Sequence, residues 1–218
     1  MSHFHQHSQS SQQTPETKGN VIHWALSYDV LSSGILRSSE ASIRTLAQVK
    51  PGDRILDVGC GSGRLTIAAQ KWVGPTGEAQ GIDPAPEAIM VARRNAARAG
   101  LAAKFEVGLV ETLPFSDATF DVVLSRLVLH HLPGDLKQRG LVEMWRVLKP
   151  GGLCLVVDFE PPKSPILRHL VENFLSPMAH IDVHEYIPLL VEAGFAEMET
   201  GPTGSKYLSY VRGRSLGK

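Results

Sequence analysis

The stretch Asp57-Val58-Gly59-Cys60-Gly61-Ser62-Gly63 decides the fold of this chain. It ends a mostly apolar run, Arg54 to Val58, that is typical of a buried strand, and it leads into a helix expected from Arg64 onward. Glycines at alternate positions permit positive φ angles and let a ligand approach the backbone. The free N–H groups at the start of the following helix suit a carboxylate or a phosphate. Taken alone, the loop is equally well interpreted as a tight turn.

From Arg54 onward, strand and helix patterns alternate, as they do in a parallel sheet covered by helices on both faces. Strands are expected at residues 54–58, 79–83, 103–107, 120–125 and 153–159, with weaker candidates at 196–200 and 206–212. Apolar residues at helical spacing separate several of them, and the last intervening helix is expected to carry Leu141, Met144, Trp145 and Leu148. Lys149-Pro150-Gly151-Gly152 should end that helix before a central strand.

The chain is expected to divide into a tail and one domain. Residues 1–20 hold His, Gln and Ser with almost no aliphatic side chains, which predicts a disordered tail, and we assign its histidines no metal-binding role. Residues 21–218 are expected to form a single domain. Apolar positions at helical spacing between residues 21 and 49 predict two amphipathic helices in front of the first strand.

Composition excludes several function classes. Lys plus Arg and Asp plus Glu both number 22, so the charge balance does not indicate a nucleic acid or an anionic membrane as partner. Cys60 and Cys154 lack CxxC spacing and suggest neither a disulfide framework nor a zinc site. No apolar run approaches the roughly 20 residues of a membrane span, and no signal peptide is evident. We expect a cytoplasmic protein, with its oligomeric state left open.

Asp83 makes the glycine loop more specific. It ends the second expected strand, 24 residues after Gly59, where a carboxylate can accept hydrogen bonds from both hydroxyls of a ribose. By itself, Asp83-Pro84 could also be a strand-ending turn in which Asp caps the next helix. Arg64 stands where a dinucleotide-binding GxGxxG loop needs its third glycine, so a nicotinamide cofactor is disfavoured. The spacing therefore favours an adenosine site.

Five motifs in a fixed order carry a family resemblance. They are Leu56 to Gly63, Gly81-Ile82-Asp83, Leu113-Pro114-Phe115, Phe120-Asp121-Val122-Val123 and Leu148-Lys149-Pro150-Gly151-Gly152. The series resembles that of class I S-adenosylmethionine-dependent methyltransferases and is similar to the group with the ubiquinone and menaquinone biosynthesis enzymes and many small-molecule methyltransferases. The resemblance covers about residues 40–160. It implies a Rossmann-like α/β fold with a mostly parallel seven-stranded sheet, a helical N-terminal front, and S-adenosyl-L-methionine as cofactor.

The same resemblance implies a cofactor site at the carboxyl ends of the strands. Asp57 would orient the ammonium group of the cofactor, directly or through water, and Asp83 would hold the ribose. The other expected contacts are Gly59 and Gly61 at the methionine part, Ile82 and Pro84 at the adenine, and also Cys60, Gly63, Leu109, Val110, Ser125 and Arg126.

One position departs from the family pattern. Members commonly carry an acidic residue after the glycine that ends the third strand, where it accepts a hydrogen bond from the adenine amino group. Here that position is Leu109, which keeps an apolar contact, and Val110 offers a backbone N–H. Glu111 would have to reach round to supply a carboxylate. We therefore expect micromolar rather than tighter affinity for the cofactor.

Candidates for catalysis follow the fourth strand. His130 and His131 come shortly after Ser125-Arg126, where ligands collect at the carboxyl ends of parallel strands, so either could be a general base with a pKa near ~6.5. The alternative is that the pair closes the loop before Pro133 through hydrogen bonds to the backbone. By resemblance, Tyr28 of the helical front could line the cofactor, although it could equally belong to the core.

Methyl transfer from a sulfonium is a direct displacement, so the protein mainly supplies alignment and desolvation, without a metal. Selection of a small, partly hydrophobic acceptor is expected in residues 21–50 and 161–187. Ser125-Arg126-Leu127-Val128 lacks the Asp- or Asn-Pro-Pro-aromatic run typical of nucleic-acid amino methyltransferases, so no nucleic acid is expected. The alternatives are a non-catalytic module that binds an adenosyl ligand or a partner and, less favoured, a nicotinamide-dependent oxidoreductase. The nucleophilic atom of the acceptor stays open.

Overall fold

One mixed sheet organises the chain. The computed structural model describes residues 40–160, 181–205 and 208–217, and within them seven strands lie in the order β3-β2-β1-β4-β5-β7-β6. The parallel strands are β1 (Arg54–Val58), β2 (Glu78–Asp83), β3 (Lys104–Val107), β4 (Phe120–Arg126) and β5 (Leu148–Phe159). β7 (Leu208–Ser215) runs antiparallel between β5 and β6 (Phe195–Pro202). The predicted mostly parallel, seven-stranded α/β sheet is confirmed.

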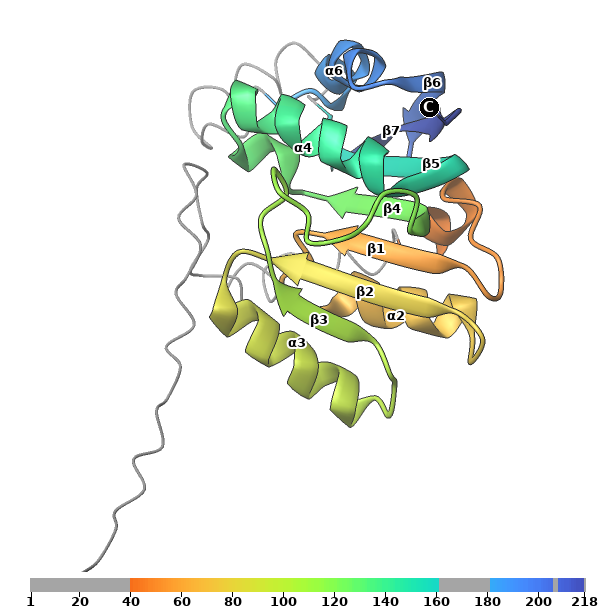
Figure 1. Ribbon diagram of the computed structural model, residues 1–218, viewed down its shortest axis with the longest axis vertical. Helices are drawn as coiled ribbons and strands as arrows, with labels where there is room; N and C mark the ends of the chain where they lie inside the picture. The colour runs from red at the N-terminus through yellow and green to blue at the C-terminus, as the bar shows by residue number, and fades with distance from the viewer. Residues whose placement is uncertain (1–39, 161–180, 206–207, 218) are drawn as a thin grey trace, which may run out of the picture.

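Helices pack on both faces of this sheet. They are α2 (Arg64–Val73), α3 (Pro86–Arg98), α4 (Gly134–Val147) and α6 (Tyr186–Glu192), with short 3-10 turns η1 (Leu129–His131) and η3 (Val183–Glu185). In Figure 1, α4 lies above β4 and runs into β5, and α2 lies behind β2. Residues 40–46 are also helical, at the end of the expected helical front. The rest of that front and the tail lie outside the described residues.

The central strands are buried on both faces. Leu56 and Val58 of β1 pack with α4 and α6, whereas Ile55 packs with α2 on the opposite face. Each of these three side chains is at most 1% exposed. Successive side chains of a strand point to opposite faces, so a strand covered on both sides reads as a nearly continuous apolar run. Asp57, which interrupts this run, is therefore a carboxyl buried at the end of a core strand.

The start of β5 differs from the prediction. Leu148 pairs with Phe120, and Leu153 pairs with Val122, so residues 149–152 interrupt the register inside the strand. The placement of Leu148 in the preceding helix is wrong, because its side chain joins the sheet core at 3% exposure. Burial beside the start of β4 outweighs the helical spacing that the residue shares with α4.

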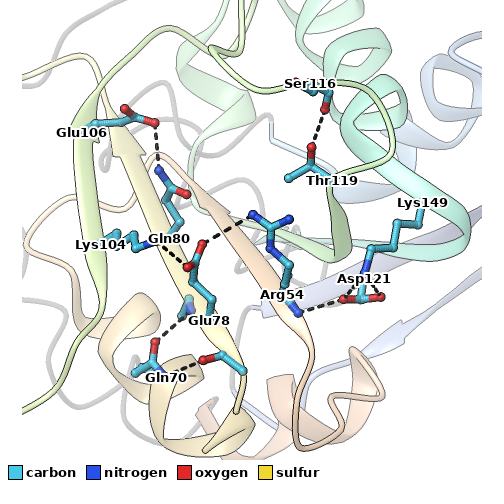
Figure 2. A network of polar contacts seen from close by, with 12 residues as sticks. Arg54, Gln70, Glu78, Gln80, Lys104, Glu106, Ser116, Thr119, Asp121 and Lys149 are labelled. Carbon is cyan, nitrogen blue, oxygen red and sulfur yellow. Dashed lines mark hydrogen bonds and ion pairs between the residues drawn. The ribbon is translucent and has the colours of Figure 1, made fainter. Parts of the chain in front are cut away.

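A polar network joins the amino ends of the parallel strands, opposite the glycine loop (Figure 2). Glu78 contacts Arg54 of β1 and Lys104 of β3. Asp121 of β4 accepts hydrogen bonds from the Lys149 ammonium group at 2.8 and 2.9 Å and from the Arg54 N–H at 2.8 Å. Partly exposed ion pairs of this kind stabilise a fold only weakly, so the network mainly aligns the strand starts. No helix among the described residues is long and apolar enough to cross a membrane.

Candidate functional site

The glycine loop turns back over β2. Gly59, Gly61 and Gly63 have φ angles of 72°, 51° and 81°, in the left-handed region that disfavours other residues. The N–H groups of Gly59 and Cys60 donate to the carbonyl of Ile82 at 2.9 and 2.8 Å. These two hydrogen bonds fix the loop against the end of the neighbouring strand.

The three glycines have different surroundings. A Cβ at Gly59 would lie 2.4 Å from the Val128 side chain, and one at Gly63 would lie 2.7 Å from the Phe105 ring. A Cβ at Gly61 would have no described heavy atom within 4 Å. Gly59 and Gly63 are therefore required by close packing, whereas Gly61 faces space that a ligand can use.

Asp83 lies beside this space. Its carboxyl oxygens accept hydrogen bonds from the N–H groups of Gly61 at 2.9 Å and Ala85 at 3.0 Å. Burial raises the pKa of Asp83, and these two backbone hydrogen bonds oppose that rise. A carboxylate has about four acceptor positions, so two remain for the hydroxyls of a ribose. The hydrogen bond with Ala85 is the local contact that a simple strand-ending turn would make. The hydrogen bond with Gly61 joins residues that lie far apart in the sequence, which a simple turn does not explain.

Asp57 is buried directly beneath the loop. It is 2% exposed, and its Oδ2 accepts a hydrogen bond of 2.6 Å from the Thr66 hydroxyl of α2. Burial raises its pKa to about 6, while Thr66 and the positive charge of Arg126 oppose the rise. An ammonium group bound next to Asp57 would favour the ionised form. Sequence reasoning missed Thr66, although a hydroxyl on the first turn of α2 is within reach of the strand end.

Two residues of α4 hold the loop after β3, which begins near Leu109. Glu143 accepts a hydrogen bond from the Leu113 N–H at 2.8 Å. Arg146 donates to the carbonyls of Leu113 at 3.0 Å and Phe115 at 2.7 Å, and it pairs with Glu143. Sequence reasoning missed this clamp. The spacing of Glu143 and Arg146 on one helix face was a signal, but nothing in the sequence places their partners about 30 residues earlier.

Of the four residues expected near the adenine, two are buried and two are partly exposed. Ile82 is 1% exposed and Val110 is 8% exposed, and both side chains belong to the core. Pro84 and Leu109 are partly exposed, and Leu109 forms an isolated bridge with Thr112. A ligand would therefore meet the side chains of Pro84 and Leu109 and the backbone of the buried pair.

The remaining expected cofactor contacts lie at the ends of β1 and β4. Cys60 is 8% exposed, and burial raises the pKa of its thiol well above the ordinary value. Ser125 is 2% exposed, and its hydroxyl has no hydrogen-bond partner among the described residues. Ser125 pairs with Val58 across the sheet, so Ser125 and Arg126 end β4 beside the glycine loop.

The histidine pair is tied to β5 and α6. Nδ1 of His130 lies 2.8 Å from Oδ1 of Asp158, and the Tyr186 hydroxyl donates to Oδ2 of Asp158 at 3.0 Å. The His130 and His131 rings lie 3.8 Å apart, and burial together with His130 lowers the pKa of His131 to about 4. His130 thus bonds to a side chain rather than to the backbone. Asp158 and Tyr186 were not predicted, and Tyr28 lies outside the described residues.

These features define a class of protein. The sheet order, with an antiparallel β7, and a glycine loop joined to a strand-ending carboxylate are those of an α/β protein that holds an adenosyl ligand at its carboxyl edge. Residues 55–152 match the family described as "Methyltransferase domain". The chain is also similar in structure to an S-adenosylmethionine-dependent methyltransferase from Aquifex aeolicus, with a TM-score of 0.72, 21% identity, and coverage of 87% of this chain and 97% of that one.

Proteins of similar sequence indicate the family to which the chain belongs. The chain is 35% identical over 179 residues to the ubiquinone/menaquinone biosynthesis C-methyltransferase of Ectopseudomonas mendocina. These residues cover 79% of this chain and 69% of the relative. The chain is 32% identical to the enzyme of that name from a Marinomonas species, covering 67% of this chain and 58% of the relative. This chain belongs to the class I S-adenosylmethionine-dependent methyltransferases. Its methyl donor is S-adenosylmethionine, and the nicotinamide alternative is set aside.

The surroundings of the glycines predict that one substitution mainly lowers stability and another mainly weakens ligand binding. Gly63→Ala should lower the free energy of unfolding by roughly 2 to 4 kcal/mol, because the added methyl meets the Phe105 ring at positive φ. Gly61→Ala should cost only about 1 kcal/mol but weaken S-adenosylhomocysteine binding at least about tenfold, because the methyl enters the ligand space. Urea denaturation and titration calorimetry measure the two effects. Equal losses of stability in the two variants would contradict this assignment.

The buried Asp57 predicts a pH dependence of stability with a definite sign. Its pKa of about 6 exceeds the ordinary 3.8, so between these pH values the unfolded chain binds fewer protons than the folded chain. The free energy of unfolding should fall by roughly 3 kcal/mol as pH rises through this window. Asp57→Asn keeps an acceptor for Thr66 and should remove the contribution of Asp57, while the contribution of Asp83, whose pKa is also raised by burial, remains. Denaturation curves for the ligand-free proteins at pH 4, 5, 6 and 7 test this, and parallel declines would refute it.

Proposed function

We propose that this enzyme methylates a small, partly hydrophobic molecule and releases S-adenosylhomocysteine. The observation that carries the cofactor part is the contact between Asp83 and the Gly61 N–H, which sets a carboxylate beside the open side of the glycine loop. A ribose can lie between these two groups, with its hydroxyls on the unused acceptor positions of Asp83.

The other ends of the cofactor follow from this placement. The ammonium group would lie near Asp57, whose raised pKa reflects a buried carboxyl that gains from a cationic partner. The adenine would lie by Pro84, which follows β2, and by Leu109, which is on the loop that Glu143 and Arg146 hold. The methionine part would then lead toward the ends of β1 and β4.

The acceptor is proposed to lie over the ends of β4 and β5. Phe159 stacks edge-on against His130 at 5.5 Å, so this end of the sheet offers aromatic surface beside polar groups. The relatives are named C-methyltransferases of ubiquinone and menaquinone biosynthesis, which supports a hydroxylated aromatic ring as the acceptor. The cofactor supplies the methyl group and the leaving group. The protein aligns the acceptor, which can lower the barrier by about 7 to 11 kcal/mol.

Titration calorimetry with S-adenosylhomocysteine tests the cofactor site. We expect micromolar affinity for the wild type and a loss of about 10- to 100-fold for Asp83→Asn, because a charged acceptor becomes neutral. Asp121→Asn is the matched control, since its carboxylate lies at the amino end of β4, where it bonds to Lys149 (Figure 2), and its affinity should equal that of the wild type. Absence of detectable binding by the wild type would refute the proposed function, and binding without slow turnover to S-adenosylhomocysteine would favour the non-catalytic alternative.

The position of Leu109 predicts a gain of affinity. Leu109→Asp supplies an acceptor for the adenine amino group on a partly exposed side chain, and we expect S-adenosylhomocysteine to bind about tenfold more tightly. Leu109→Ala removes the same apolar contact without supplying the acceptor, so it should give no gain. The two variants are compared by calorimetry at one pH. A gain in both, or in neither, would show that adenine does not contact this position as proposed.

A further inference from the structure

We propose that His130 is the general base of the methyl transfer, positioned by Asp158 and Tyr186, and that the acceptor carries a hydroxyl group whose proton His130 removes. This inference rests on the proposed function and extends it to the chemistry of the acceptor. It selects one of the two neighbouring histidines and adds two positioning residues on β5 and α6.

The hydrogen bonds of Asp158 assign the proton on His130. Asp158 is fully buried, and Oδ1 accepts from the Phe159 N–H at 2.9 Å while Oδ2 accepts from the Tyr186 hydroxyl at 3.0 Å. Both oxygens of Asp158 already accept hydrogen bonds, so we assign Nδ1 of His130, 2.8 Å from Oδ1, as a further donor to this carboxyl group. In the neutral ring, the lone pair is then on Nε2. We assign this tautomer from the partners of the ring.

Within the described residues, Nε2 of His130 is buried without a hydrogen-bond partner, as is Nε2 of His131. The His130 side chain is 4% exposed, and its Nε2 makes no hydrogen bond within the described part of the chain. A buried polar atom without a partner is costly, so natural structures usually satisfy it. A hydroxyl group of a bound acceptor would supply the missing donor. The same atom is the one that must take the proton.

His131 is a weak base in this position. Burial and the adjacent His130 ring lower the pKa of His131 to about 4, so it holds a proton weakly at neutral pH. The contact with Asp158 is made by the ring of His130, in the way that the Asp of a catalytic triad orients its His. The Tyr186 hydroxyl that contacts Asp158 is itself surrounded by charged groups: Glu185 and Asp182 act on it electrostatically, and the Lys137 ammonium group lies 5.6 Å from the centroid of its ring.

The base and the methyl donor share one end of the sheet. Val128 packs over Gly59, since a Cβ at Gly59 would lie 2.4 Å from it, and η1 with His130 follows at once. The N–H of Leu127 donates to the Val157 carbonyl at 2.9 Å, which brings this segment beside Asp158. The base therefore lies next to the segment that covers the methionine end of the glycine loop.

The proposed step balances in protons and electrons. The hydroxyl proton of the acceptor moves to Nε2 of His130, and the oxygen or the adjacent ring carbon forms a bond to the methyl carbon. The methyl–sulfur bond breaks, and its electron pair stays on the sulfur of S-adenosylhomocysteine. When carbon is methylated, the ring loses one C–H proton to solvent and becomes aromatic again. In that case the oxygen takes back the proton held by His130, whereas after methylation of oxygen His130 releases its proton to solvent, so either route produces one proton per turnover.

The test uses the full chain and two probe acceptors, the diol 1,4-dihydroxynaphthalene and the amine 1-naphthylamine. S-adenosylhomocysteine formation is measured between pH 5.5 and 8.5. His130→Gln and Asp158→Asn should each lower kcat on the diol by about 10²- to 10⁴-fold, with the KM for S-adenosylmethionine within about threefold of wild type. Tyr186→Phe should give a smaller loss. His184→Gln is the matched control, because His184 forms a similar pair with Asp182 at 2.7 Å on η3 and should leave kcat unchanged.

The protonation of His130 gives two further readouts, one kinetic and one by NMR, and only the NMR readout needs no acceptor. In the wild type, kcat should rise with pH to a plateau, because the base must be neutral, and this rise should vanish in His130→Gln. Long-range ¹⁵N NMR of the histidines should show a proton on Nδ1 of His130 and none on Nε2. Asp158→Asn should change that pattern while calorimetry still detects S-adenosylhomocysteine binding, which would show that the variant is folded.

Each contrary outcome has a separate meaning. A proton on Nε2 of His130 in the wild type, or a His130→Gln variant within threefold of wild-type kcat on the diol, would overturn the assignment of the base. Turnover of the amine without the diol, or of neither probe, would overturn the hydroxylated acceptor. Failure of the wild type to bind S-adenosylhomocysteine would instead refute the proposed function itself.

Discussion

The attachment of the glycine loop to the end of β2 is the interaction on which the site depends. The N–H groups of Gly59 and Cys60 bond to the Ile82 carbonyl, and the N–H of Gly61 bonds to Asp83. The loop can make these bonds because β1 and β2 are parallel neighbours, whose carboxyl ends meet at one edge. The cofactor site is thus a property of the sheet rather than of the loop alone.

A second constraint is the burial of charge at that edge. Asp57 and Asp158 end core strands, and both are nearly or fully buried. Their partners differ: the hydrogen bonds described for Asp57 come from Thr66, through its hydroxyl and its backbone N–H, whereas donors from three residues surround Asp158. A buried carboxyl with few donors gains from a cationic ligand, and one with many donors can orient a neighbouring side chain. The two positions therefore suit binding and positioning, respectively.

Helix α4 connects the two halves of the site. Its Glu143 and Arg146 hold the loop that leads away from β3, and its apolar face packs in the same core as Tyr186 of α6. Packing on this face of the sheet thereby brings α6 to the end of β5, where Tyr186 reaches Asp158. The adenine side and the proposed base thus depend on the same layer of helices.

The sequence alone determined the alternation of strands and helices, the glycine loop and the spacing to Asp83, because periodicity and backbone freedom are local properties. It could not assign separate roles to Gly61 and Gly63, since only the packed neighbours distinguish open space from contact with Phe105. Nor could it find Asp158 and Tyr186, which lie 28 and 56 residues from His130 and meet it only where β4, β5 and α6 converge. Tertiary structure decided these contacts, because hydrogen bonding between distant residues depends on which strand ends lie side by side.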